Sequence, residues 1–211
     1  MGMSRWGSVL ALSGALATSA YAADAQKTFT QGGTNPAAIA CSTCHGADGT
    51  GMPAAGFPRL AGLPAEYFAK QIADFRSGSR ANPIMLPIAQ ALSEDEVQAL
   101  ASMLANMPGP PVKPINRAQA AKGLGQTLAL RGAWDRNIPE CVSCHGPGGI
   151  GVGASFPPLA GQSAQYLVSQ LNAWRQETRK NDPDDLMGHI ARSLTEAEVE
   201  AVSRYFAELS Q

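Results

Sequence analysis

The spacing of apolar side chains predicts two amphipathic helices, one over residues 66–76 and one over residues 166–174. In both stretches the apolar positions fall on one face of a helix. They are Tyr67, Phe68, Ile72 and Phe75 in the first stretch and Tyr166, Leu167, Leu171 and Trp174 in the second. Nowhere does the chain alternate apolar and polar residues as a half-buried strand would. The pattern therefore predicts an all-α fold.

Polar residues mark the start of a further helix in each half of the chain. Ser93 precedes Glu96 by three positions, and Thr195 precedes Glu198 by the same interval. In such a capping box, the hydroxyl and the carboxylate each accept a hydrogen bond from a free backbone N–H group at the helix start. Both halves should therefore contain a capped helix after the amphipathic one.

These elements belong to an internal repeat. The hexapeptide F-P-R-L-A-G at residues 57–62 returns as F-P-P-L-A-G at residues 156–161. Further equal pairs follow in the same order, namely Tyr67 and Tyr166, Gln71 and Gln170, Arg76 and Arg175, and Arg80 and Arg179. A repeat of this kind indicates similar units in tandem.

A proline-rich segment separates the two copies. Four prolines fall between Pro108 and Pro114, which favours a stiff, extended linker. We therefore predict a first domain over residues 23–107, a linker over residues 108–114 and a second domain over residues 115–211.

One more helix is expected near the start of each domain. It should be short in the first domain, over residues 36–41, and longer in the second, over residues 117–130. The capped helices should end near residues 107 and 209.

Residues 1–22 have the pattern of a secretory signal peptide. Arg5 supplies a positive charge, residues 6–17 are mostly apolar, and Ala20-Tyr21-Ala22 resembles a cleavage site. The apolar run is too short for a mature membrane-spanning helix, and an uncleaved anchor is the alternative. We expect cleavage after Ala22 and a location in the periplasm.

All four cysteines lie in two pentapeptides, C-S-T-C-H at residues 41–45 and C-V-S-C-H at residues 141–145. C-x-x-C-H is the attachment signature of c-type haem. The two thiols reach the vinyl groups of one haem, and the histidine then lies where its imidazole can bind the iron. The motifs predict two covalently bound haem c groups, attached through Cys41, Cys44, Cys141 and Cys144, with His45 and His145 as axial ligands.

Two other uses of C-x-x-C fit less well. A thioredoxin-like redox pair would need a βαβ pattern nearby, and none is visible. The paired halves of a structural zinc site are usually much closer in sequence than Cys41 and Cys141.

The repeat also selects a second axial ligand for each iron. Met85 lies seven residues before Leu92, and Met187 lies seven before Leu194. No other methionine after the signal segment has a methionine counterpart in the second copy. We predict Met85 and Met187 as the ligands; core filling is the alternative, and His189 is a candidate competitor for Met187.

Other repeated positions suggest supporting contacts. A carbonyl near Pro58 or Pro157 is expected to accept the Nδ1–H of the haem-ligating histidine. Arg80 and Arg179 either pair with haem propionates or stand at a solvated helix end, where the helix dipole favours them.

In their order, these motifs resemble the cytochrome c4 family. C-x-x-C-H, F-P-x-L-A-G, Y-x-x-x-Q and a methionine before L-[ST]-x-x-E all occur twice, from about Ile39 to Phe206. The resemblance implies a periplasmic protein of two class I cytochrome c domains, whose haem edges meet near a pseudo-twofold axis. It also implies His/Met ligation at both irons, by His45 and Met85 and by His145 and Met187.

The chain departs from the family's pattern at two places. Leu63-Pro64 stands in the first domain where the second has Gln162-Ser163, and the family usually has Gln there. An acidic segment, residues 182–185, precedes Met187 and alters the electrostatics near the second haem.

We therefore predict an electron carrier rather than an enzyme, since methionine as sixth ligand closes the iron to substrate and raises its potential. Expected partners are redox proteins: a donor such as a quinol-oxidising complex and an acceptor such as a terminal oxidase. The net charge of −1 does not suggest a nucleic-acid partner, and peripheral membrane association stays open. The alternatives are a dihaem peroxidase or thiosulfate-oxidising enzyme, and a cytochrome subunit of a dehydrogenase complex. Unequal charge around the haems predicts two different potentials.

Overall fold

The computed structural model describes residues 24–113, 115, 117–118 and 120–210. The predicted signal peptide lies outside the described residues. Within them the chain forms α-helices, short 3-10 helices and isolated β-bridges, and no β-strand. The prediction of an all-α fold is confirmed.

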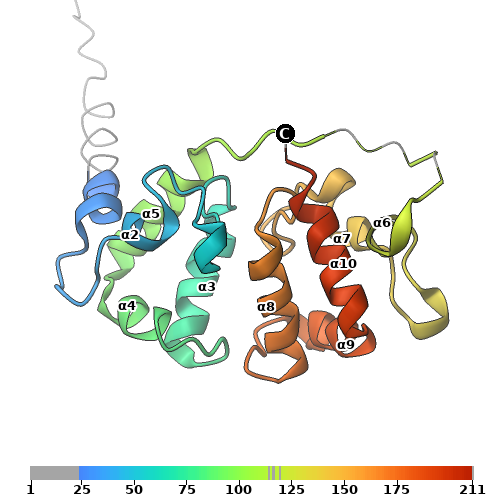
Figure 1. Cartoon of the computed structure of the whole chain (residues 1–211). Coiled ribbons are helices and arrows are strands. Elements are labelled where there is room, and N and C mark those ends of the chain that lie inside the picture. The colour runs from blue at the N-terminus through green and yellow to red at the C-terminus, as the bar shows by residue number, and fades with distance from the viewer. Residues whose placement is uncertain (1–23, 114, 116, 119, 211) are drawn as a thin grey trace, which may run out of the picture.

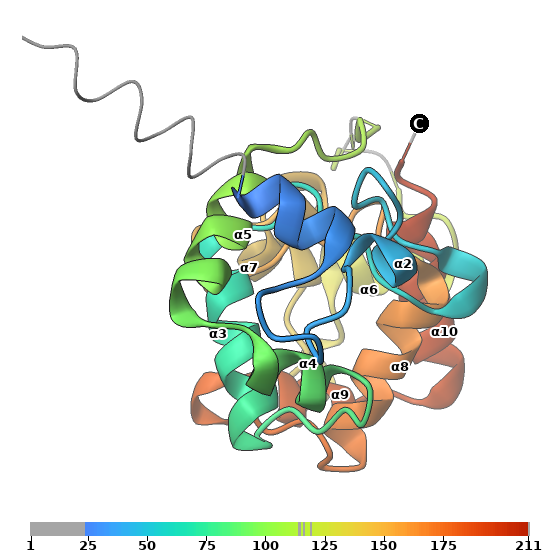
Figure 2. The same ribbon diagram turned by 90° about the vertical axis from the view of Figure 1, so that its left-hand side faces the viewer.

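The first domain packs its helices around one apolar core. Residues 24–31 form a helix, which lies across the front of the domain in Figure 2. The other elements are α2 (Ser42–His45), the 3-10 helix η1 (Pro53–Ala55), α3 (Ala65–Ser77), α4 (Met85–Ala91) and α5 (Glu94–Asn106). Helix α3 packs against α4 and α5. The core contains Phe29, Phe68, Ile72, Val97, Leu100 and Leu104.

The second domain repeats this arrangement. Its elements are α6 (Gly123–Arg131), η2 (Trp134–Arg136), α7 (Cys141–His145), η3 (Pro147–Gly149), α8 (Ala164–Arg175), η4 (Pro183–Asp185), α9 (Leu186–Ser193) and α10 (Glu196–Ala207). Helix α10 packs against α6 and α8, and α8 packs against α9. The core contains Leu128, Leu130, Ile138, Val142, Val199 and Phe206.

Both capping boxes form as the sequence predicts. The hydroxyl of Ser93 accepts a hydrogen bond from the backbone N–H of Glu96 at 3.2 Å, and the Glu96 carboxylate accepts one from Ser93 at 2.8 Å. Thr195 and Glu198 make the same pair of bonds at 3.3 and 2.8 Å. The capped helices end within two residues of the expected positions.

The predicted third helix of the first domain is wrong in position, whereas that of the second domain is confirmed over residues 123–130 but begins later than expected. Residues 36–37 form a turn and Ala38 a bend, because the side chain and carbonyl of Asn35 accept hydrogen bonds from the N–H groups of Ala37 and Ala38. The helix lies upstream, over residues 24–31. In the second domain, α6 begins only at Gly123, since Lys122 is extended at φ −107° and ψ 114°.

The two domains meet through α3 and α8, which face each other at the centre of Figure 1. The loops that follow these helices pair in antiparallel fashion through a bridge between Arg80 and Arg179. The N–H of Ala81 donates to the carbonyl of Thr178 at 2.8 Å, and the N–H of Lys180 donates to that of Ser79 at 2.7 Å. Equivalent residues therefore exchange equivalent bonds, as a twofold relation requires.

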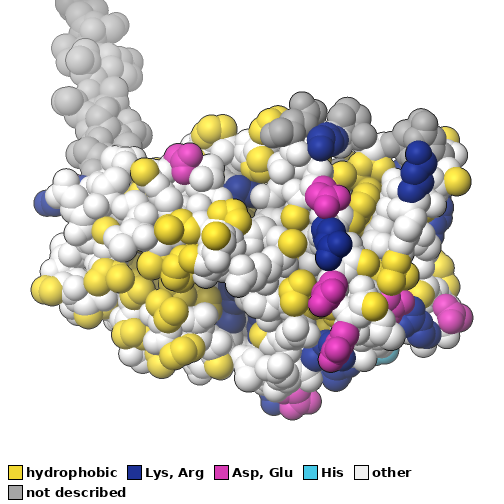
Figure 3. Space-filling view, viewed as in Figure 1, with side chains coloured by type: hydrophobic (Ala, Val, Ile, Leu, Met, Phe, Trp, Pro, Cys, Tyr) yellow, Lys and Arg dark blue, Asp and Glu magenta, His cyan; other side chains and the backbone are white. Residues whose placement is uncertain are grey.

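The two domains present different surfaces on one side of the molecule. On the face in Figure 3, hydrophobic side chains cover much of the first domain, and charged side chains gather over the second. No helix in the described part of the chain is long and apolar enough to cross a membrane.

Candidate haem-binding sites

Each C-x-x-C-H motif forms a short helix at the edge of a domain core. Cys41 caps the start of α2, and Cys141 begins α7. The four thiols are free and partly buried. Burial raises the pKa of Cys41 to about 11 and that of Cys141 to about 12, so both are protonated thiols. Redox-active dithiol pairs instead depend on a lowered thiol pKa, which argues against that use of the motif.

The histidines of both motifs are buried and oriented by a backbone carbonyl. His45 and His145 have exposed fractions of 8% and 7%. Nδ1 of His45 lies 2.9 Å from the carbonyl oxygen of Pro58, and Nδ1 of His145 lies 2.8 Å from that of Pro157. Because a carbonyl only accepts, Nδ1 carries the proton and Nε2 keeps a free lone pair. The expected carbonyl contact is confirmed in both domains.

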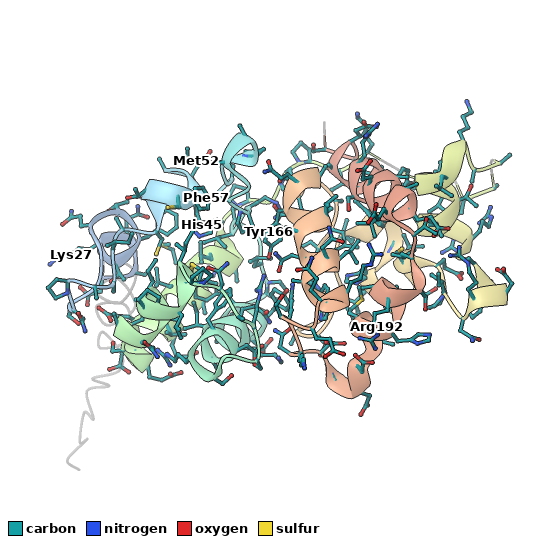
Figure 4. All side chains as sticks on the ribbon, turned by 60° about the horizontal axis from the view of Figure 1, so that its bottom comes forward. Lys27, His45, Met52, Phe57, Tyr166 and Arg192 are labelled. Atoms are coloured by element: carbon teal, nitrogen blue, oxygen red, sulfur yellow. The ribbon has the colours of Figure 1, made fainter. Side chains whose placement is uncertain are left out.

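Burial also keeps these two rings neutral. It lowers the pKa of His45 and of His145, against a smaller opposing effect of the carbonyl bond. A neutral imidazole is the form that binds a metal. An aromatic ring stands edge-on to each imidazole, with centroids 6.3 Å apart for His45 and Phe57 and 6.1 Å for His145 and Phe156. Figure 4 shows His45 close to Phe57.

Two glycines that the sequence analysis did not single out bring the carbonyl to the histidine. Gly51 has φ +86°, and a Cβ built on it would lie 2.7 Å from the backbone nitrogen of Arg59. Gly151 has φ +89° and would meet Pro158 at 2.9 Å. Only glycine permits this conformation and approach. The repeated G-x-G at residues 49–51 and 149–151 is the signal that could have indicated them.

The predicted methionines occupy equivalent places. Met85 is the first residue of α4 and packs, partly buried, against the first core. Met187 is the second residue of α9 and is also partly buried. His189 is exposed. The role of Met85 and Met187 as axial ligands remains a prediction.

Arg80 and Arg179 do not stand at solvated helix ends, so that alternative is wrong. Their exposed fractions are 7% and 5%. Nη2 of Arg80 donates to the hydroxyl of Tyr166 at 2.6 Å, and Nη2 of Arg179 donates to that of Tyr67 at 3.3 Å. Figure 4 shows Tyr166 where the two domains meet. Each arginine thus reaches into the other domain.

Amide side chains complete this polar network. Gln170 accepts from Arg80 at 2.7 Å and from Arg179 at 2.8 Å, and Gln71 accepts from the same two arginines at 2.9 and 3.2 Å. Within the described residues, both guanidiniums donate these side-chain hydrogen bonds to neutral oxygens. Two positive charges are therefore buried side by side at the domain junction.

The zinc alternative finds no support in the side-chain arrangement. Among the described residues, no three His, Cys, Asp or Glu side chains gather closely enough to hold a metal ion. Each motif instead supplies two thiols and one oriented imidazole beside an apolar core, which fits covalent attachment of haem.

Comparison with known proteins identifies the family. The cytochrome c family profile matches residues 22–122 and 125–210. The chain belongs to the cytochrome c family. Within it, the chain is similar to the cytochrome c4 of Thiocapsa roseopersicina, with 39% identity over 81% of this chain and 88% of that protein. The solved structure of reduced recombinant cytochrome c4 from Pseudomonas stutzeri is similar too, with a TM-score of 0.70 and 33% identity over 80% of this chain and 93% of that one.

Two further relatives carry names from thiosulfate oxidation. The "thiosulfate dehydrogenase electron acceptor" of Stutzerimonas stutzeri is 67% identical over 93% of this chain and 91% of that protein. The structure of "thiosulfate dehydrogenase (TsdBA)" from Marichromatium purpuratum matches with a TM-score of 0.79 and 40% identity. That match covers 88% of this chain and 40% of the other chain.

These comparisons confirm the predicted family, the two tandem domains and the two covalently bound haem c groups. The chain is a dihaem cytochrome c4-like electron carrier and not an enzyme, as expected.

Proposed function

We propose that this cytochrome accepts electrons from a thiosulfate-oxidising dehydrogenase in the periplasm and passes them to a redox acceptor such as a terminal oxidase. The 67% identity with a protein named for accepting electrons from thiosulfate dehydrogenase is the observation that carries this proposal. A second relative of that name, from Thiomonas intermedia, is 46% identical. The donor proposed here is thus different from the quinol-oxidising complex expected from the sequence.

The chain's own residues would hold each haem from two sides. We infer that Cys41 and Cys44 attach the first haem, while Nε2 of His45 and the thioether of Met85 bind its iron. The bound haem supplies a one-electron ferric/ferrous couple. The Pro58 carbonyl fixes the imidazole, and the methionine would be a second protein ligand that keeps substrate from the metal. In the second domain the same roles fall to Cys141, Cys144, His145 and Met187.

Arg80 and Arg179 would serve the haem carboxylates. Burial, and then the nearby Arg80, lower the pKa of the Arg179 guanidinium, which reflects the cost of placing two cations together without an anion. The propionates of two haems meeting at this junction would compensate that charge through charge-assisted hydrogen bonds.

One arrangement of donor and carrier has specific support. In the Marichromatium neighbour, the region that matches this chain is part of a longer chain that bears the name thiosulfate dehydrogenase. This favours docking of the present cytochrome directly on its dehydrogenase, by a contact that need not be permanent.

The decisive experiment mixes the purified holoprotein with thiosulfate and a thiosulfate dehydrogenase and follows haem reduction by absorbance. Both haems should be reduced when the dehydrogenase is present, and neither with thiosulfate alone. Absence of reduction in the complete mixture would refute the donor. Turnover of thiosulfate by the cytochrome alone, or rapid cyanide binding at one haem, would instead favour the enzyme alternative.

The location rests on the signal-like segment of residues 1–22, and we propose export with cleavage after Ala22. Mass spectrometry of the mature protein tests the proposal and the haem attachment together. A chain beginning at residue 23 and carrying two porphyrins agrees with it, and an intact leader contradicts it.

A further inference from the structure

Side chains that differ in charge bind the first backbone N–H groups of the two methionine-bearing helices. In the first domain, Oδ1 of Asn82 accepts a hydrogen bond from the backbone N–H of Met85 at 2.8 Å. In the second domain, Oδ2 of Asp182 accepts one from the N–H of Met187, also at 2.8 Å. Each of these oxygens also accepts a second backbone N–H group, and Asn82 and Asp182 each precede a proline. A neutral amide and a carboxylate thus hold the same place beside the two predicted sulfur ligands.

Two cations near Asp182 form ion pairs with other carboxylates. Asp182 lines a surface hollow together with Arg192 and Lys180. Arg192 is paired with Asp185, and Lys180 with Glu177 at 3.1 Å. The Asp182 carboxylate accepts hydrogen bonds from neutral N–H groups, namely the two backbone groups and the indole of Trp174 at 2.7 Å. One negative charge therefore stays beside the methionine helix.

The remaining cation of that hollow does not distinguish the domains. Arg179 lines it as well, but Arg80 holds the equivalent position in the first domain. Between Arg80 and Met85 the first domain has no charged residue at all. Asp184 adds a further negative charge in the second domain, but its side chain is exposed.

A carboxylate near the iron stabilises the ferric state, which carries one more positive charge than the ferrous state. We propose that Asp182 lowers the reduction potential of the second haem below that of the first, so that electrons entering the second domain move on to the first. The inference rests on Met187 as an axial ligand, as proposed above. A unit charge about 10 Å from the iron, at an effective dielectric constant of about 20, changes the ferric-to-ferrous ratio by about tenfold. For one electron this equals about 59 mV.

The test is a redox titration of the holoprotein in which the paramagnetically shifted NMR signals of each haem are followed separately. In the wild type the second haem should have the lower potential. Asp182→Asn keeps an oxygen for the two backbone N–H groups and removes the charge. The potential of the second haem should therefore rise by about 59 mV, the equivalent of a tenfold change in the ferric-to-ferrous ratio, while that of the first haem stays unchanged. The reciprocal Asn82→Asp should lower the potential of the first haem alone.

Two control variants separate charge from its side effects. Trp174→Phe removes the indole hydrogen bond and keeps the charge, and Asp184→Asn removes an exposed charge from the same segment, at a φ of +54° that asparagine tolerates. Both should shift the second potential less than Asp182→Asn does. Two outcomes for Asp182→Asn would overturn the inference: neither reduction potential changes, or both change equally. Either outcome counts only if the red absorption band of methionine-bound ferric haem persists in the variant. Absence of that band in the wild type would instead refute the ligand assignment.

Discussion

At the scale of single residues, Gly51 determines where the imidazole of His45 is held. Its positive φ folds the chain so that the Pro58 carbonyl reaches Nδ1 of His45, and its N–H donates to the His45 carbonyl at 2.8 Å. Any side chain here would collide with the backbone of the Phe-Pro loop. The orientation of the His45 imidazole therefore depends on the absence of a side chain at residue 51.

The first prediction compares two glycine-to-alanine changes. Gly51→Ala should destabilise the holoprotein by about 2–4 kcal/mol, the sum of left-handed strain and backbone overlap. Gly78→Ala, at φ +81° with nothing within 4 Å of the added Cβ, carries the strain alone and should cost about 1 kcal/mol. Denaturant unfolding measures both. Equal losses would show that the close approach at Gly51 is not what requires glycine.

Removing a predicted sulfur ligand should affect one haem at a time. Met85→Ala should abolish the methionine–iron band of the first haem, lower its potential by about 100 mV or more because methionine favours ferrous iron, and open that iron to cyanide. Met187→Ala should do the same at the second haem. Spectroscopy and redox titration measure these effects. Met52→Ala, at a side chain 43% exposed, is the control and should change none of them.

At the scale of helices, the start of α10 ties the second domain together through charge. Glu198 is the carboxylate member of the capping box and also accepts a hydrogen bond from Nη2 of Arg136 at 2.5 Å. The Arg136 guanidinium lowers the pKa of Glu198 from 4.5 to about 2. The equivalent Glu96 in the first domain accepts instead from the backbone N–H of Thr34 at 2.6 Å, so the two caps should respond differently to acid.

The lowered pKa of Glu198 predicts that the free energy of unfolding falls over a defined range of acid pH. A group whose folded pKa is depressed stabilises the fold above its unfolded pKa, so the contribution of Glu198 should be complete above about pH 4.5 and lost as the pH falls toward about 2. We expect about 1–2 kcal/mol, allowing for solvent screening. Unfolding measured across this window should show a shallower loss in Glu198→Gln than in the wild type. An unchanged pH dependence would contradict the assignment.

Local sequence signals predicted these helices well where side chains cap them and poorly where the backbone turns. Ser93 and Thr195 carry their partner three residues on, so both helix starts could be read directly. The turn at Asn35 depends on hydrogen bonds back to that residue's own side chain and carbonyl, and α6 starts after an extended Lys122. Neither feature leaves an apolar period, so the short helix of the first domain was misplaced and the start of α6 was predicted too early.

At the scale of the whole molecule, the hydrogen bonds between the two domains could not be predicted from the sequence. The repeat paired Arg80 with Arg179, but it could not indicate that each guanidinium crosses to the other domain. Such contacts depend on how the two bodies dock. The haem motifs, in contrast, are local, and their chemistry could be inferred from five residues each.

The substitution Gln162→Leu tests how much the domain junction contributes to stability. Gln162 is 4% exposed and pairs with the backbone of Arg59 across the junction, accepting from its N–H at 3.0 Å and donating to its carbonyl at 3.1 Å. Leucine, which the first domain has at the equivalent Leu63, would leave both backbone groups buried without these partners. We expect a loss of about 1–3 kcal/mol and faster hydrogen exchange at the Arg59 amide. Gln98→Leu, at an exposed position of α5, should change neither. If Gln162→Leu leaves the Arg59 amide equally protected, these reciprocal bonds do not hold the domains together, and the other contacts across the junction, among them the arginine–tyrosine network and the backbone bridge, do so.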